Sequence, residues 1–293
     1  MKKLPLPVQN DERYLTSLAS NHKLTSINPH LRVNADSIKA QYAHYMQQLG
    51  NAWNIIPNVI TDELKSALIK SYETRQDDEL KFIKNMRDTI DETCSMCGGK
   101  FPWSIDHVLP KSDYPEWAIF SKNLVPACRC NIRRGTLLKG SPATNARVLH
   151  PYFDDEFETR QLSCLITTTN HFRWIKVEIV YIQPNHPAIN SIKYHVENIV
   201  KRSGLEKYLS RTLWSKLMNQ PGLAIRGLYE RETLTVANVI HLIEQDLRWF
   251  DDRTGTPNNW DSIFLHGLLN SPRVVDFVTQ HHNQFVLNGG LTN

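Results

Sequence analysis

Two short stretches, Ser104-Ile-Asp-His-Val-Leu-Pro-Lys-Ser112 and Asn123-Leu-Val-Pro-Ala-Cys-Arg-Cys-Asn131, hold most of the information in this 293-residue sequence. The first places an aspartate beside a histidine at the end of a short apolar run. The second adds two asparagines and two cysteines. A further pair, Cys94-Ser-Met-Cys97, stands just before them. Carboxylate, imidazole and thiolate groups packed this closely indicate metal binding combined with proton transfer.

The cysteines fall into two close pairs and one isolated residue, Cys164. In a reducing compartment such pairs more often bind metal than form disulfides. Gly98-Gly99 allows the tight turn of a zinc knuckle after Cys94 and Cys97, so we expect Cys128 and Cys130 to complete a structural Zn²⁺ site. The second pair has only one intervening residue, which leaves open that another ligand replaces one of its thiols. The alternative is a set of buried thiols without metal, and Cys164 is expected to be an inert core residue.

The bulk composition fits a globular chain. Its mean hydropathy is −0.42 and 41% of its residues are hydrophobic. No stretch approaches the roughly 18 consecutive apolar residues of a membrane span. The first residues lack the apolar run of about 7–15 residues that marks a secretory signal. We therefore expect a cytoplasmic protein that does not enter a membrane.

The positive charge is concentrated around the two motifs. The whole chain has a formal net charge of +4, and residues 98–140 hold seven Lys or Arg against three acids. This segment therefore accounts for the entire excess. A local basic field beside a candidate metal site suits a polyanionic partner such as nucleic acid. The alternative is an ordinary solvated basic face.

Hydrophobic periodicity predicts four regions and an α+β fold. These are a helical region over residues 1–92, a hairpin core over 93–148, a β-rich segment over 149–190 and a helical region over 191–293. Residues 1–35 are expected to form an irregular arm, with a possible helix break near 76–78. Further helices are expected over 34–50, 61–72, 80–90, 192–203, 205–218, 234–249, 260–269 and 272–279, and strands over 101–107, 123–127, 162–169 and 171–182.

The combined pattern of Asp106-His107-Val-Leu-Pro-Lys-Ser, Asn123-Leu-Val-Pro-Ala-Cys128 and Cys130-Asn131-Ile-Arg-Arg-Gly135 resembles an HNH endonuclease of the ββα-metal type with cysteine-bound zinc. The resemblance covers roughly residues 94–135. It implies that His107 is the general base that activates water and that Asp106 and Asn131 are ligands of a catalytic Mg²⁺ or Mn²⁺. It also implies that Asn123 ties the hairpin loop and orients the base.

Residues around this pattern extend the interpretation. The basic side chains expected to hold a nucleic-acid backbone are Lys111, Arg129, Arg133 and Arg134. His150, in Leu149-His-Pro-Tyr-Phe-Asp154, is expected to pack the β-rich segment against the core, although its neighbouring acid makes a second site the alternative. Aromatic residues after residue 192 form either a partner-docking surface or simply core.

The segments Asp106-His-Val-Leu-Pro-Lys-Ser112 and Leu149-His-Pro-Tyr-Phe-Asp154, together with the order of regions, also resemble the HNH effector of Septu-type anti-phage systems, which is found in some retron cassettes as well. That resemblance implies an ABC/SMC-like ATPase partner that controls the nuclease. Three functions stay open from the sequence. They are a DNA-cleaving nuclease, which we favour, an RNA-cleaving nuclease acting for instance on tRNA, and a zinc-hairpin binding module whose catalytic site has lapsed.

Overall fold

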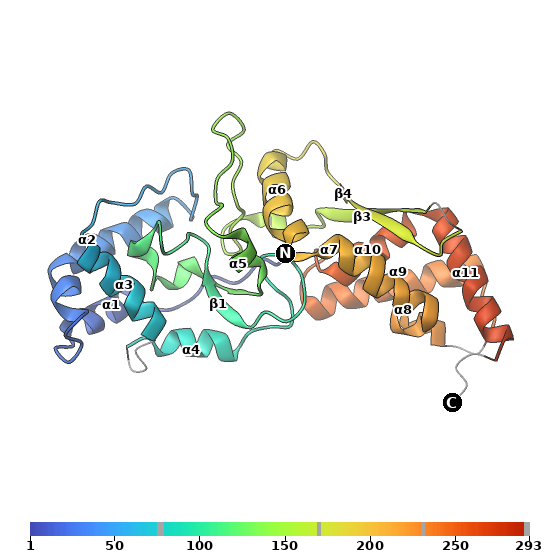
Figure 1. Ribbon diagram of the computed structural model, residues 1–293, viewed down its shortest axis with the longest axis horizontal. Coiled ribbons are helices and arrows are strands. Elements are labelled where there is room, and N and C mark those ends of the chain that lie inside the picture. The colour runs from blue at the N-terminus through green and yellow to red at the C-terminus, as the bar shows by residue number, and fades with distance from the viewer. Residues whose placement is uncertain (75–78, 169–170, 230–231, 290–293) are drawn as a thin grey trace.

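The computed structural model describes residues 1–74, 79–168, 171–229 and 232–289. Within these ranges the chain is α+β, with two small two-stranded antiparallel sheets among many helices. The molecule is elongated, and the first four helices and the last four lie at opposite ends (Figure 1). Helix α5 and the strand β1 lie between these ends. Buried apolar residues from all four predicted regions form one continuous core, and the predicted domain boundaries stay a prediction.

The N-terminal end is more helical than expected. Residues 1–10 are irregular, but residues 11–35 contain α1 (Asp11–Ser20) and the first turns of α2 (Asn28–Gln47), so the prediction of an irregular arm over residues 1–35 was wrong. The Asn10 side chain caps α1 by accepting a hydrogen bond from the Arg13 backbone N–H at 3.0 Å. Leu15 and Leu18 bury one face of the helix. These few apolar residues, among many polar ones, gave a weak sequence signal.

The next two helices follow the predicted pattern. Helix α3 (Asp62–Thr74) starts with two acids, which favour a helix N-terminus, and buries Leu64, Leu68 and Tyr72. Helix α4 (Lys81–Asp88) is shorter than the predicted range and buries Phe82 and Ile83. The predicted break near 76–78 lies outside the described residues.

The predicted hairpin is present at the centre of the molecule. Strand β1 (Ser104–His107) pairs antiparallel with β2 (Leu124–Ala127), and the register sets Asp106 opposite Val125 and His107 opposite Leu124. Strand β1 is shorter than predicted because Phe101 adopts a left-handed φ of 59°, which breaks an extended strand. Helix α5 (Cys130–Arg134) follows β2 directly, so the local order is strand, strand, helix.

The second sheet packs against C-terminal helices. Strand β3 (Leu162–Thr168) pairs with β4 (Ile175–Tyr181), as predicted, while His171 and Phe172 have left-handed φ values and belong to the connecting turn. Helix α10 (Trp260–Leu269) packs on β3 and coincides with its predicted range. The remaining helices are α6 (Ile189–His195), α7 (Leu205–Lys207), α8 (Trp214–Asn219), α9 (Val236–Thr254) and α11 (Pro272–Leu287).

The first residues of the chain run through the middle of the molecule (Figure 1). Met1 is fully buried, and its amino group donates to the Asn258 carbonyl at 3.0 Å. The backbone N–H of Lys2 donates to the Ser95 carbonyl at 2.9 Å, and that of Leu4 donates to the Pro151 carbonyl at 2.9 Å. This strap therefore joins the loop before β1 to segments from both later regions. No helix in the described ranges is long and apolar enough to cross a membrane.

Helix α10 approaches β3 so closely that only glycine fits at Gly267. A Cβ atom at this position would lie 2.2 Å from the Cys164 Sγ atom and 2.7 Å from the Cys164 carbonyl oxygen. We therefore expect Gly267→Ala to lower the free energy of unfolding by roughly 2 kcal/mol, although alanine has the higher helix propensity. Urea denaturation measures this change. In a double-mutant cycle, Cys164→Ala is expected to relieve part of the loss. A more stable Gly267→Ala variant would contradict the described packing.

Candidate active site and thiol cluster

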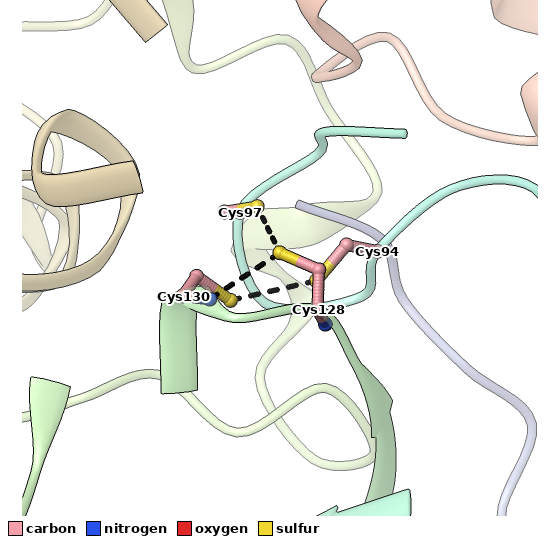
Figure 2. Close-up of side chains that lie close together, drawn as sticks. All are labelled: Cys94, Cys97, Cys128 and Cys130. Atoms are coloured by element: carbon pink, nitrogen blue, oxygen red, sulfur yellow. Dashed lines mark hydrogen bonds between the residues drawn. The ribbon is translucent and has the colours of Figure 1, made fainter. Parts of the chain in front are cut away.

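Four thiols converge beside the hairpin. The Sγ atoms of Cys94, Cys97, Cys128 and Cys130 all lie within 4.8 Å of one another, and three of these residues are buried (Figure 2). The Cys94–Cys130 and Cys97–Cys128 sulfur pairs are 3.6 and 3.5 Å apart. A tetrahedral Zn²⁺ with bonds of about 2.3 Å would space its sulfur ligands by about 3.8 Å. The predicted Cys₄ cluster is therefore present, and its dimensions suit zinc.

The short Cys128-Arg-Cys130 spacing is accommodated by a change of backbone direction. Cys128 follows the end of β2, and Cys130 is the first residue of α5. Arg129 between them has φ −62° and ψ −7°, a turn that brings both thiols to the same side. Both therefore belong to the cluster, and no replacement ligand is needed.

Backbone N–H groups also point at the sulfurs. Gly99 donates to Cys97 Sγ, Cys128 to Cys94 Sγ and Cys130 to Cys128 Sγ, each at 3.4 Å. These donors stabilise negative charge on sulfur. Hydrogen bonds from the neighbouring thiols, Cys128 first, lower the pKa of Cys94 well below its ordinary value. Hydrogen bonds within the same set, those with Cys128 first, raise the pKa of Cys97 and of Cys130 well above the ordinary value. The thiolate is the form that binds metal, and in the metal-free cluster Cys94 is held in that form.

The loop between the first two cysteines is anchored to the C-terminal half. The Trp260 indole N–H donates to the Cys97 carbonyl at 2.7 Å. His195 Nε2 lies 2.6 Å from the Met96 carbonyl oxygen, and its Nδ1 accepts from the Leu149 N–H at 3.1 Å. Because a carbonyl only accepts, the proton of His195 is on Nε2. The cluster thus fastens the hairpin to helices that lie more than sixty residues further along the chain.

The predicted catalytic aspartate and histidine occupy the end of β1. The Asp106 side chain is 29% exposed, whereas that of His107 is 3% exposed. Asp106 Oδ1 accepts the His107 backbone N–H at 2.8 Å and lies 3.7 Å from His107 Nδ1. Burial raises the pKa of Asp106, but hydrogen bonds with His107 and Asn131 outweigh it and lower that pKa below its ordinary value. A carboxylate is therefore held at the strand end.

The protonation pattern of His107 follows from its contacts. Its Nε2 atom lies 2.8 Å from the Ala118 carbonyl oxygen, so Nε2 carries the proton and Nδ1 keeps a lone pair. The ring packs edge to face against Tyr72, with centroids 4.4 Å apart. Its orientation is thus fixed from two sides, with Nδ1 as the basic nitrogen, which is what a general base requires.

Asn131, on α5, completes the arrangement. Its Nδ2 donates to the His107 carbonyl at 3.1 Å. Its Oδ1 is buried and has no hydrogen-bond partner among the described residues. A buried acceptor without a partner is costly, and a cation would satisfy it. Hard divalent ions prefer oxygen ligands, so Asp106 and Asn131 suit Mg²⁺ or Mn²⁺.

Asn123 has the tying position that was predicted for it. It is fully buried, and its Nδ2 donates to the carbonyls of Leu109 and Trp117 at 3.0 and 3.1 Å. Its Oδ1 accepts from the Leu109 N–H at 2.8 Å. Asn123 thus closes the loop between the two strands. Ala118, whose carbonyl holds His107, is the residue after Trp117, so this closure also positions the His107 ring.

A hydrogen-bond chain from two other regions supports Asn123. The Tyr45 hydroxyl of α2 donates to Asn123 Oδ1 at 3.1 Å and lies 2.9 Å from His150 Nε2. Since the hydroxyl has one proton, His150 Nε2 must donate to it, and His150 Nδ1 accepts from the Tyr152 N–H at 3.2 Å. His150 is fully buried, so it packs the β-rich segment against the core as predicted.

The four basic residues predicted to hold nucleic acid have different environments. Arg129 and Arg133 are exposed, and Lys111 pairs with Glu73 at 2.6 Å. Arg134 is only 2% exposed, and its guanidinium donates to the carbonyls of His107 and Val108 at 3.0 and 2.8 Å. The interpretation of Arg134 as a backbone contact therefore changes, because it clamps the end of β1 from α5.

Sequence reasoning did not identify several residues that shape the site, namely Tyr45, Tyr72, His195 and the clamping role of Arg134. Each acts through a contact with a residue distant in sequence, and no local motif marks it. Of the C-terminal aromatic residues, Trp214 and Phe264 are buried, which agrees with a core role for these two.

Comparison with known proteins adds one relative. No family model and no solved structure matches the chain. Among curated proteins, the chain is similar to "Protein ea31" of Escherichia phage lambda, with 25% identity over 308 residues. The match covers 92% of this chain and 98% of that protein. The similarity therefore extends well beyond the residues around the hairpin.

Removing one thiol tests the metal assignment. We expect the purified protein to hold about one Zn²⁺ per chain and Cys128→Ser to lose it. The loss should lower the free energy of unfolding by at least about 3 kcal/mol, or Tm by roughly 6–12 °C. Mass spectrometry of bound metal and thermal denaturation measure both. Cys164→Ala, which removes a thiol outside the cluster, is expected to keep its zinc. A zinc-free protein with unchanged stability would refute the site.

His150 makes stability depend on pH. Burial lowers the pKa of His150 to about 3, against about 6.5 in the unfolded chain. The unfolded state therefore binds the proton first as pH falls. The free energy of unfolding therefore has its full value above about pH 6.5 and falls progressively below it, by about 2 kcal/mol between pH 7 and 5. His150→Gln should flatten the pH dependence by this amount in urea denaturation. Parallel curves for both proteins would exclude the assignment.

Proposed function

We propose that this chain is a metal-dependent HNH endonuclease that hydrolyses phosphodiester bonds of nucleic acid, with DNA as the favoured substrate. One observation carries the proposal. Three groups meet where β1 ends against α5: the Asp106 carboxylate, His107 with its proton fixed on Nε2, and the Asn131 Oδ1 atom, which has no partner in the described part of the chain. Asn123 and the thiol cluster hold this arrangement in place.

Asp106 and Asn131 would hold the divalent ion. A bound Mg²⁺ or Mn²⁺ would polarise the scissile phosphate and neutralise the charge that develops on it. These two side chains supply oxygen ligands from a strand and a helix. Arg134 and Asn131 both donate to the His107 carbonyl, which fixes the distance between the strand end and the helix.

His107 then acts on water. A water oxygen attacks phosphorus while His107 Nδ1 takes its proton. The P–O bond to the leaving strand breaks, and the leaving oxygen takes a proton from solvent. The Ala118 carbonyl stabilises the resulting imidazolium through Nε2, and it keeps the ring from rotating.

Control by a partner is the second part of the proposal. Tyr72 of α3 packs on the His107 ring and its hydroxyl donates to the Ile105 carbonyl, so the base is covered by an N-terminal helix. A covered base suits a nuclease that an ABC/SMC-like ATPase activates in an anti-phage defence system, of the kind also found in retron cassettes. The similarity to a phage protein fits a role in the encounter between phage and host.

Cleavage assays on the variants of the base test the activity. We expect His107→Ala to reduce metal-dependent cleavage of plasmid DNA by about 10²- to 10⁴-fold, because general-base catalysis is lost. His241→Ala is the matched control, since His241 is exposed on α9 and bonds only Gln245 among the described residues. Omitting Mg²⁺ and Mn²⁺, rather than adding chelator, keeps any zinc in place. The purified chain is assayed alone and with a candidate ATPase.

The outcomes separate the three functions. Cleavage of plasmid that requires His107 supports a DNA nuclease. Cleavage of total RNA alone, with the same requirement, would assign an RNA nuclease. Binding without cleavage under every metal and partner would leave a lapsed binding module. Undiminished cleavage by zinc-loaded His107→Ala would refute the assignment of the base.

A further inference from the structure

We propose that a groove beside the thiol cluster binds a single-stranded segment of nucleic acid, which it recognises through unpaired bases and phosphates. The groove has a volume of about 580 Å³. The loop at residues 99–103 and the start of α5 form one wall, and residues 203–216 with Trp260 form the other. We call it the aromatic–basic groove. The inference deepens the proposed nuclease function, yet it concerns binding and is tested separately.

Four cations line the groove, namely Lys100, Arg129, Arg133 and Lys216. No acidic residue is among the described residues that line it. Arg129 and Lys216 have no carboxylate partner in the described part of the chain. Lys100 pairs with Asp261 at 2.8 Å. The Asp261 side chain is only 9% exposed and is not among the residues that line the groove. The charge therefore suits a polyanion, and phosphate groups would neutralise it.

Arg133 is held in position for this role. Its guanidinium donates to the carbonyls of Arg202 and Ser203 at 3.2 and 3.0 Å, across the groove from α5. Arg129 lies one helical turn before it and faces the same direction. The two arginines are thus presented together, whereas Asn131 and Arg134 face the hairpin.

Aromatic side chains supply the second kind of contact. Trp103 is 56% exposed and Phe101 is 77% exposed. Exposing two large apolar side chains on one loop to water is unfavourable, and such exposed apolar surface often marks a binding site. On the opposite wall Tyr208 and Trp260 pack together, with ring centroids 5.3 Å apart. The Cys97 carbonyl anchors the indole of Trp260. Exposed rings next to free cations are the arrangement on which bases stack while phosphates are neutralised.

The size and position of the groove select a single strand. A volume of about 580 Å³ holds one or two nucleotides and not a duplex. Stacking on Trp103 also requires bases that are not stacked within a helix. Arg133 lines the groove and Asn131 contacts the His107 carbonyl. The two residues are two positions apart on α5, about 200° around a helix that is about 10–12 Å across with its side chains, so the groove and the candidate active site lie on different sides of α5. A strand of a few nucleotides that crosses α5 would connect the groove with the candidate active site.

Binding measurements on the full chain test this inference. We use His107→Ala as the background, so that no substrate is cut, and measure fluorescence anisotropy with labelled oligo(dT), oligo(U) and a blunt DNA duplex. Trp103→Ala is expected to weaken binding of the single strands about tenfold, the usual effect of losing one stacking platform. Arg129→Ala with Lys216→Ala should weaken it and reduce the salt dependence by about two charges.

Matched controls use the same residue types at other exposed positions. Trp174→Ala, at a tryptophan that is 69% exposed in the β3–β4 connection, and Arg273→Ala, at an exposed arginine of α11, should leave binding unchanged. Zinc content and thermal denaturation verify that each variant is folded. The Lys216 substitution alone, on α8, provides a second variant if Trp103→Ala does not fold.

Every result decides the inference. Weaker single-strand binding in the groove variants, with controls unchanged, supports it, and the stronger of oligo(dT) and oligo(U) identifies the ligand as DNA or RNA. Equal binding by all folded variants, or binding of duplex alone, overturns it and leaves a protein partner as the occupant. If the wild-type chain binds single strands through the groove but never cleaves them, the proposed nuclease function is wrong and the proposed binding role of the groove stands. A chain that cleaves nucleic acid but whose groove variants bind single strands as tightly as the unmodified groove would overturn the groove and leave the nuclease.

Discussion

The convergence of four thiols is the constraint on which the central part of the molecule depends. Two four-residue strands and a five-residue helix bury too little surface to hold one geometry unaided. A metal ion bound by Cys94, Cys97, Cys128 and Cys130 would supply that missing free energy. The cluster also fixes the start of α5, and with it the position of Asn131 relative to Asp106.

A second constraint comes from outside the hairpin. Asn123 is held by Tyr45 of α2, which is held in turn by His150 of the β-rich segment. Residues from three regions, separated by up to 105 positions, thus meet at the Tyr45 hydroxyl. The position of the candidate base depends on all of them through the loop that carries Ala118. The geometry of the candidate site therefore belongs to the whole chain and not to a separable motif.

Local signals in the sequence predicted the elements that local interactions determine. Helix α10, both strands of the second sheet and the thiol pairs follow from periodicity and spacing. Helix α1 was missed because Leu15 and Leu18 are few among polar residues. The roles of Tyr45, Tyr72 and Arg134 were beyond prediction, since each depends on a partner that the fold brings from elsewhere. Arg134 looks like a surface cation in the sequence, but its side chain is buried in the fold and therefore has a structural role.

The thiol cluster also has a mechanical consequence. Its first pair precedes β1 and its second pair follows β2, so a bound ion would close the intervening chain into a ring. Tension passing along the chain from one end of the molecule to the other would then cross the metal–sulfur bonds and bypass the ring. Asp106, His107 and Asn123 lie inside it. The path of the chain through these three residues would thus be shielded from such tension, whereas Tyr45 and His150, which hold Asn123 from outside the ring, would not be.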